Sequence, residues 1–100
     1  MRLYFNEDLV HNKPEEGDVL AAFESLRAAG EARLELRRGP DSSLSVSRES
    51  GLGFMVALQR PDGIFGLSVH ELFAEQVASA LREYWGGQPL ALMDEAEASA

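Results

Sequence analysis

The chain contains no cysteine, few basic residues and no long apolar run, and each absence excludes a class of protein. Without cysteine there is no disulfide framework, no thiolate zinc site and no cysteine nucleophile. Residues 1–5 are followed at once by polar Asn6, Glu7 and Asp8, so we expect neither a signal peptide nor a membrane span. The length of 100 residues predicts a single domain, and the missing signal segment and membrane span predict that it is cytoplasmic.

Basic side chains are outnumbered by acidic ones, nine against seventeen, which leaves a formal charge of −8. A surface of this sign repels phosphate backbones, so direct binding of nucleic acid is disfavoured. The excess charge either maintains solubility or faces a basic partner. Composition alone leaves both interpretations open.

Motifs for catalysis and for ligand binding are missing as well. His11 and His70 have no second histidine or carboxylate at a metal-ligand spacing on the same element. No serine lies in a nucleophile elbow, and there is no glycine-rich phosphate loop. We therefore predict no catalytic residue, no metal site and no cofactor.

The strongest structural signal that is present is the uncharged segment GFMVAL at residues 53–58. Glycine precedes it and a Pro-Asp-Gly turn follows it, so it predicts a central strand that is apolar on both faces. One face would carry Phe54, Val56 and Leu58, and the other Met55 and Ala57. The second face then needs cover, from a helix or from a partner.

Periodicity on either side of this segment predicts an α+β domain. A short strand at residues 3–5 precedes a helix over residues 19–29, with Asp18 as the N-cap of that helix. Period-two alternation then predicts strands at residues 32–37, 43–47, 53–58 and 64–67, which short turns join into an antiparallel meander. The expected fold is a four- or five-stranded, mostly antiparallel sheet with two helices, in the order strand, helix, strands, helix.

The second helix is predicted to begin at Ser68, because Glu71 follows at the spacing of a capping box. Its apolar stripe would cover one face of the sheet and consists of Val69, Leu72, Phe73, Val77, Ala80, Leu81 and Tyr84. After Pro89, residues 90–93 are interpreted as a short edge strand or a docked segment, which ends a single domain over residues 1–93. Residues 94–100 are predicted to be an acidic tail that frays.

Several of these segments share residue types and spacing with a known family. They are Leu44-Ser45-Val46, Gly51-x-Gly53-Phe54-Met55-Val56 and Val77-x-x-Ala80-Leu81-x-x-Tyr84-Trp85-Gly86-Gly87-x-Pro89. Over residues 19–92 the chain resembles the immunity proteins of bacterial polymorphic toxin systems, which include inhibitors of deaminase toxins. The resemblance implies a stoichiometric inhibitor, not an enzyme, that binds a cognate basic, nucleic-acid-processing toxin and blocks its active site.

Partner-binding residues are predicted from their expected exposure. Asp41, Glu49 and Asp62 lie at predicted hairpin turns, and Trp85 is either an interface anchor or a plug over the end of the second helix. Two other functions stay open. One is a small acidic adaptor, similar to a secretion chaperone, that acts as a homodimer, and the other is a small enzyme without a recognisable motif.

Overall fold

A computed structural model describes residues 1–48 and 52–99, except the side chains of residues 97–99. Within this part of the chain, six antiparallel strands form one open sheet in the order β2-β1-β3-β4-β5-β6. The strands are β1 (Arg2–Phe5), β2 (Asp8–His11), β3 (Ala32–Gly39), β4 (Ser42–Arg48), β5 (Gly53–Arg60) and β6 (Gly63–His70). The helices are α1 (Glu16–Ala28), α2 (Ala74–Trp85) and α3 (Ala91–Ser99), and a 3₁₀ turn, η1 (Glu71–Phe73), precedes α2. The predicted α+β class and the meander from β3 to β6 are confirmed, although there are more strands and helices than expected.

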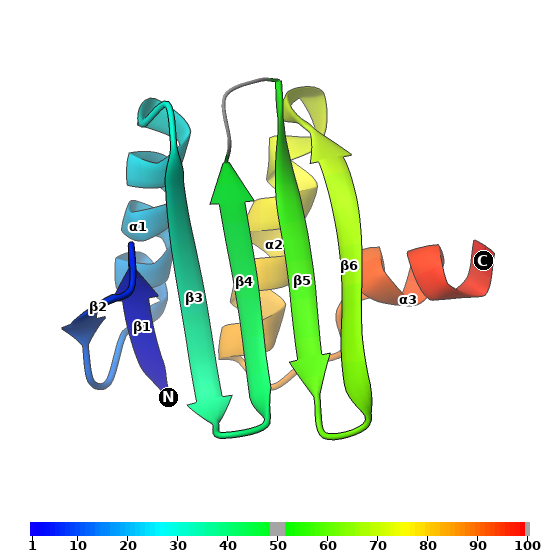
Figure 1. Cartoon of the computed structure of the whole chain (residues 1–100), viewed down its shortest axis with the longest axis horizontal. Coiled ribbons are helices and arrows are strands. Elements are labelled where there is room, and N and C mark those ends of the chain that lie inside the picture. The colour runs from blue at the N-terminus through cyan, green and yellow to red at the C-terminus, as the bar shows by residue number, and fades with distance from the viewer. Residues whose placement is uncertain (49–51, 100) are drawn as a thin grey trace.

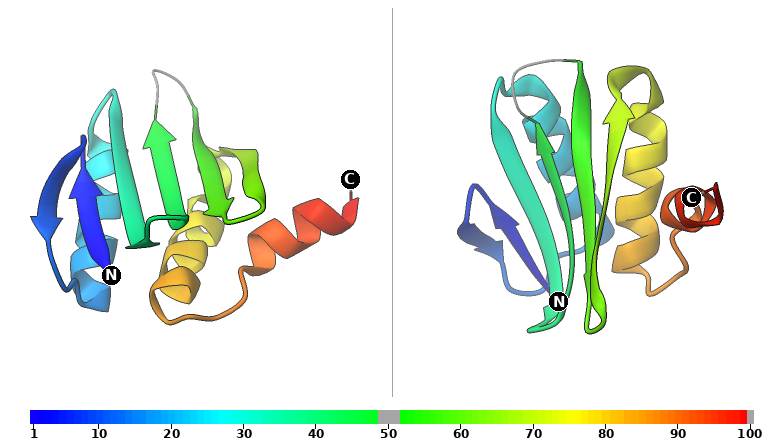
Figure 2. Two further views of the ribbon diagram at one scale, coloured as in Figure 1. Left: turned by 60° about the horizontal axis from the view of Figure 1, so that its bottom comes forward. Right: turned by 45° about the vertical axis from the view of Figure 1, so that its right-hand side comes forward.

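Both long helices cover the same face of the sheet. Figure 1 shows α1 and α2 side by side behind the strands, and Figure 2 shows α3 next to α2 on that same side. Phe54, Val56 and Leu58 are buried on the helix face, as predicted. Met55 on the opposite face is 48% exposed, and within the described residues no helix lies over it. The outer face of the sheet is therefore open in this chain.

The segment 53–58 does not form the centre of the sheet, because β5 lies next to the edge strand β6 and the middle is formed by β3 and β4. In an antiparallel sheet with one open face, the middle strands alternate apolar and polar residues. The uninterrupted apolar run at residues 53–58 therefore does not identify the central strand of this sheet. Gly53 has a separate steric role, since a Cβ at this position would lie 2.6 Å from the carbonyl oxygen of Val69 on β6.

The hairpin of β1 and β2 was not predicted, because residues 6–17 read as a polar loop. Asn6 and Glu7 form its turn with positive φ angles of 50° and 72°. Two consecutive residues with positive φ fit the twist of a two-residue hairpin, and asparagine tolerates this conformation. The Asn6 side chain also accepts a 2.9 Å hydrogen bond from the Arg33 amide, which ties the turn to β3.

The helix α1 begins earlier than predicted, and Asp18 is not its N-cap. Glu15 occupies the N-cap position, and its backbone amide donates to Asp18 Oδ2 at 2.9 Å. Asp18 therefore lies inside the first turn and reaches back to the residue before the helix, which is the geometry of a capping box. Its carboxylate still stabilises the positive end of the helix dipole.

The prediction that Ser68 begins the second helix is wrong. Ser68 pairs with Met55 within β6, and this strand continues to His70. His70 is instead the cap, because its Nδ1 accepts a 3.1 Å hydrogen bond from the Leu72 amide. Leu72 and Phe73 precede α2 and are 82% and 51% exposed, so they do not belong to its apolar stripe.

The segment after Pro89 forms a helix where an edge strand or docked segment was expected. Leu90 and Met93 are buried and attach α3 to the core. The Asp94 amide donates to the Leu90 carbonyl at 2.9 Å, which begins the helical ladder. Residues 94–99, which we predicted to fray, belong to α3.

Candidate functional site

An open groove lies between α2 and α3 in the helix layer. On α2, Glu75, Ser79 and Glu83 are spaced by four, so they lie on the polar face opposite the buried stripe. The second wall comes from α3. This α2–α3 groove has a volume of about 420 Å³ and is lined by Glu75, Gln76, Ser79, Glu83, Ala91, Leu92 and Glu95.

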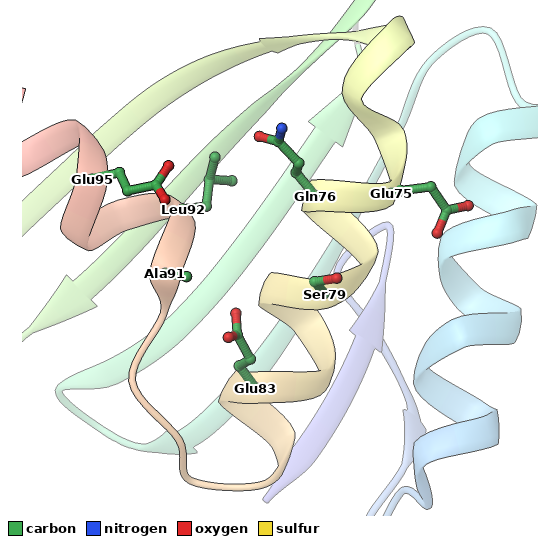
Figure 3. A pocket seen from close by; sticks show the side chains of 7 residues that line it. All are labelled: Glu75, Gln76, Ser79, Glu83, Ala91, Leu92 and Glu95. Carbon is green, nitrogen blue, oxygen red and sulfur yellow. The ribbon is translucent and has the colours of Figure 1, made fainter.

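Two carboxylates dominate the space between the helices. Figure 3 shows Glu83 and Glu95 directed into the groove from opposite walls, with Leu92 beside Glu95, whereas Glu75 points toward α1. Carboxylates on an open surface attract cationic side chains over about one Debye length, roughly 8 Å at physiological salt. The groove can therefore accept a basic group next to an apolar contact.

Sequence reasoning missed this groove because one of its walls was not predicted. The spacing of Glu75, Ser79 and Glu83 was visible in the sequence and marks an exposed acidic face on α2. A groove, however, needs the second helix, and residues 91–99 were not recognised as helical.

Trp85 lies at one end of the groove, in an adjoining hollow of about 420 Å³ that Glu83 and Ser79 also line. Its indole N–H donates to the Pro14 carbonyl at 2.8 Å, and the ring packs partly buried against the core. This contact fits the predicted plug over the helix end. Part of the ring still faces the hollow, together with Glu16 and Arg82.

The predicted turn residues lie elsewhere. Asp41 and Asp62 are exposed in the β3–β4 and β5–β6 turns, at the same end of the sheet (Figure 1), and neither lines the groove. Asp62 is 3.9 Å from the Arg60 guanidinium, and its side chain is 85% exposed. Glu49 lies outside the described residues. A role of these three residues in partner binding stays a prediction.

A cluster of charges near the start of α2 is structural. Glu71 lies 3.1 Å from Arg27 and 3.0 Å from Arg48, and the Arg48 guanidinium also donates to the Arg27 carbonyl at 3.0 Å. Arg48 approaches Glu71 Oε2 as an ion pair without hydrogen-bond alignment. The Arg27 guanidinium donates hydrogen bonds to the Glu71 carboxylate, which raises the pKa of Arg27 because these bonds favour the charged form. These charges join α1, β4 and η1 and are used within the fold.

A second hollow, of about 260 Å³, lies between α1 and the β1–β2 hairpin. His11 Nε2 is 3.7 Å from Asp18 Oδ1 at this hollow, and Ser25 lines it too. In the described part of the chain Ser25 makes no hydrogen bond with His11, so no serine is aligned with a base here. The walls are otherwise mostly apolar, with Leu3, Phe5 and Val10 among them.

The described residues include no group of three or more histidine, aspartate or glutamate side chains that could hold a metal ion. Over the same residues, we find no helix with the length and apolar character that a membrane crossing requires. Comparison of the chain with protein-family models, with curated proteins and with solved structures finds no match.

The described residues behind the resemblance to immunity proteins lie in β4, β5 and α2 and in the segment 86–89 after α2, whereas Gly51 lies outside the described residues. Eight of the sixteen residues are buried in the core, namely Leu44, Val46, Phe54, Val56, Val77, Ala80, Leu81 and Tyr84. They determine how the sheet and α2 pack together. These eight positions concern the core, and they carry no information about the surface that would bind a partner.

Proposed function

We propose that this chain is an immunity protein that binds a basic bacterial toxin in the cytoplasm and blocks its active site. The observation that carries the proposal is the α2–α3 groove, which Glu83 and Glu95 line with Leu92 beside Glu95, on a chain of net charge −8. Acidic groups accelerate the encounter with a basic partner, and a few apolar anchors slow its dissociation.

Charge is distributed unevenly over the two layers, which supports the helix side as the binding surface. The outer face of β3 carries Arg33 and Arg37 with Glu35 between them, and Arg37 pairs with Glu35 at 3.0 Å. The helix side carries the groove carboxylates and Glu16. A basic toxin is therefore attracted to the helices and not to the open sheet.

Co-expression tests the proposal directly. Each reading frame next to the gene is expressed in a laboratory bacterium, with and without this chain, and growth is measured. We expect one frame to be toxic and the chain to restore growth. The double variant Glu83→Lys, Glu95→Lys should lose this protection, whereas Asp8→Lys, Glu31→Lys should keep it. The control makes the same change in net charge at exposed positions away from the groove.

Circular dichroism checks that each variant is folded. We expect it to be, because Asp8, Glu31 and Glu95 are exposed and Glu83 is partly exposed. Protection that survives in the groove variant would exclude the groove as the binding surface. The absence of any toxic neighbouring frame, or toxicity that the chain does not relieve, would reject the immunity function itself.

A homodimeric adaptor is the second candidate, and the exposure of Leu72 and Phe73 favours it. Apolar side chains that are 82% and 51% exposed on adjacent positions form a natural contact for another protein. Sedimentation equilibrium separates the candidates, since the adaptor is a dimer alone and the inhibitor is a monomer that forms a one-to-one complex.

A further inference from the structure

The strand β6 is a long edge without protection. It pairs with β5 over all eight residues from Gly63 to His70 without a register shift, and in the described chain no strand lies on its other side. It contains no proline, lysine, arginine, aspartate or glutamate. An edge of this kind presents a row of unpaired backbone groups that can accept another strand.

The opposite edge of the sheet differs in each respect. β2 has only four residues, begins with Asp8 and has an irregular register with β1. Pro14 follows shortly after its end. Short length, charge and irregular pairing are the means by which proteins prevent strand addition, so β2 is protected and β6 is not.

A mostly apolar hollow, which Ser68, His70 and Gln76 also line, lies directly beside the β6 edge, on the helix side. It has a volume of about 480 Å³, and its walls include Leu67 and Val69 from β6, Phe73 from η1, and Leu92 and Ala96 from α3. Glu95 lines it as well and is shared with the α2–α3 groove. In Figures 1 and 2, α3 extends past β6, so a strand added to β6 would lie over this helix.

We propose that β6 binds an extended segment of a basic partner protein, which adds a seventh strand to the sheet. Backbone hydrogen bonds to β6 hold the segment, and its alternate side chains face the helix layer. On that side an apolar residue enters the hollow beside Phe73 and Leu92, and a lysine or arginine pairs with Glu95. The positive charge of the segment rests on the proposed function, whereas the use of the β6 edge does not.

Charge selects this occupant over a second copy of the chain. Two copies carry −8 each, and pairing through β6 would bring both Glu95 side chains toward one interface. Like charges at an interface oppose association, and opposite charges promote it. A basic segment meets the same edge with complementary charge.

Synthetic peptides test the edge without knowledge of the partner. The probe is the acetylated and amidated peptide SKTFTVSK, which places lysine, phenylalanine, valine and lysine on one side of a strand. Two controls replace both lysines by glutamate, or methylate alternate backbone amides. Titration of the ¹⁵N-labelled protein should shift β6 amide resonances with the first peptide, and both controls should bind at least about tenfold more weakly.

Adjacent residues of η1 provide matched protein variants. Phe73 lines the hollow and Leu72 does not, and both side chains are largely exposed, so serine at either position should leave the fold intact. We expect Phe73→Ser to weaken peptide binding at least about fivefold and Leu72→Ser to leave it within about twofold. Ile64→Ser, on the open face of the same strand, should also have no effect.

Three results would overturn the inference. The first is the absence of β6 shifts at a peptide concentration of about 1 mM. The second is equal binding of the lysine and glutamate peptides. The third is a dimer of the protein alone that Phe73→Ser converts to a monomer, because the edge would then serve a second copy. None of these results depends on a toxin, so the immunity function can fail while the edge site stands, and the reverse also holds.

Discussion

The guanidinium of Arg27 lies 3.1 Å from the carboxylate of Glu71, and this contact joins the end of α1 to the turn before α2. Arg48 approaches the same carboxylate at 3.0 Å, so one acidic group compensates two basic ones. Glu71 and Arg48 are mostly buried, with 27% and 15% of their side-chain surfaces exposed. The cluster links α1, β4 and the turn before α2, close to Phe73.

Glu71→Gln should destabilise the protein by about 2 kcal/mol, because it leaves two guanidinium groups close together without their counter-charge. Urea denaturation measures this change in the free energy of unfolding. Glu24→Gln is the control, since Glu24 is 3.6 Å from Arg27 but 69% exposed, and it should cost less than about 0.5 kcal/mol. Equal effects of the two variants would contradict a structural role of Glu71.

The alkaline pH dependence follows from the raised pKa of Arg27. A group whose pKa is higher in the folded state contributes its full stability below the pKa of the unfolded chain and loses it only as pH rises through the folded pKa. The stability difference between the wild type and Glu71→Gln should therefore be the same at about pH 7 and about pH 10. A difference that shrinks over this range would show that another group carries the effect.

Trp85→Phe should lower the free energy of unfolding by about 1 kcal/mol, because the Pro14 carbonyl loses its 2.8 Å hydrogen bond. The phenyl ring keeps most of the packing against the core. If Trp85 is also an interface anchor, this variant lowers the affinity for the partner even where the protein is fully folded. Isothermal titration calorimetry measures that affinity. Unchanged stability would show that the indole contact is dispensable.

Two glycines should respond to alanine in opposite directions. At Gly53 the new Cβ would lie 2.6 Å from a backbone oxygen of β6, so Gly53→Ala should cost about 2 kcal/mol or more. At Gly17, in the first turn of α1, nothing lies within 4 Å of the new Cβ, and Gly17→Ala should stabilise by up to about 1 kcal/mol. Thermal denaturation measures the change in stability for both variants. If Gly53→Ala stabilised the protein as Gly17→Ala does, the close approach of β6 at Gly53 would be contradicted.

The acidic turn residues can be compared with the groove at equal change of charge. Two double variants can be compared once a partner is identified. The turn pair is Asp41→Lys with Asp62→Lys, the groove pair is Glu83→Lys with Glu95→Lys, and both change the net charge by the same amount. We expect the groove pair to lower the affinity at least about tenfold and the turn pair to lower it less than about threefold, mostly through slower association. Surface plasmon resonance measures both affinities. A larger loss of affinity in the turn pair than in the groove pair would favour the turns, as predicted from the sequence, as the binding surface.

The local pattern of this sequence was enough to predict the meander and the buried face of β5. Alternating residues such as Leu34 and Leu36 with Arg33 and Glu35 predict strands, because side chains on a strand point alternately to opposite faces. The same reasoning placed Phe54, Val56 and Leu58 together in the core. These properties depend on neighbours in the chain.

Only the tertiary structure decided which face is covered, where α2 begins and what lies beside the β6 edge. Pairing with β5 extends β6 through Ser68 and His70, and long-range hydrogen bonds outweigh the local capping signal. The α2–α3 groove and the hollow at Phe73 need α3, whose short apolar segment becomes a helix when Leu90 and Met93 are buried. A binding surface made from separate segments depends on such contacts, and no single stretch of the sequence contains it.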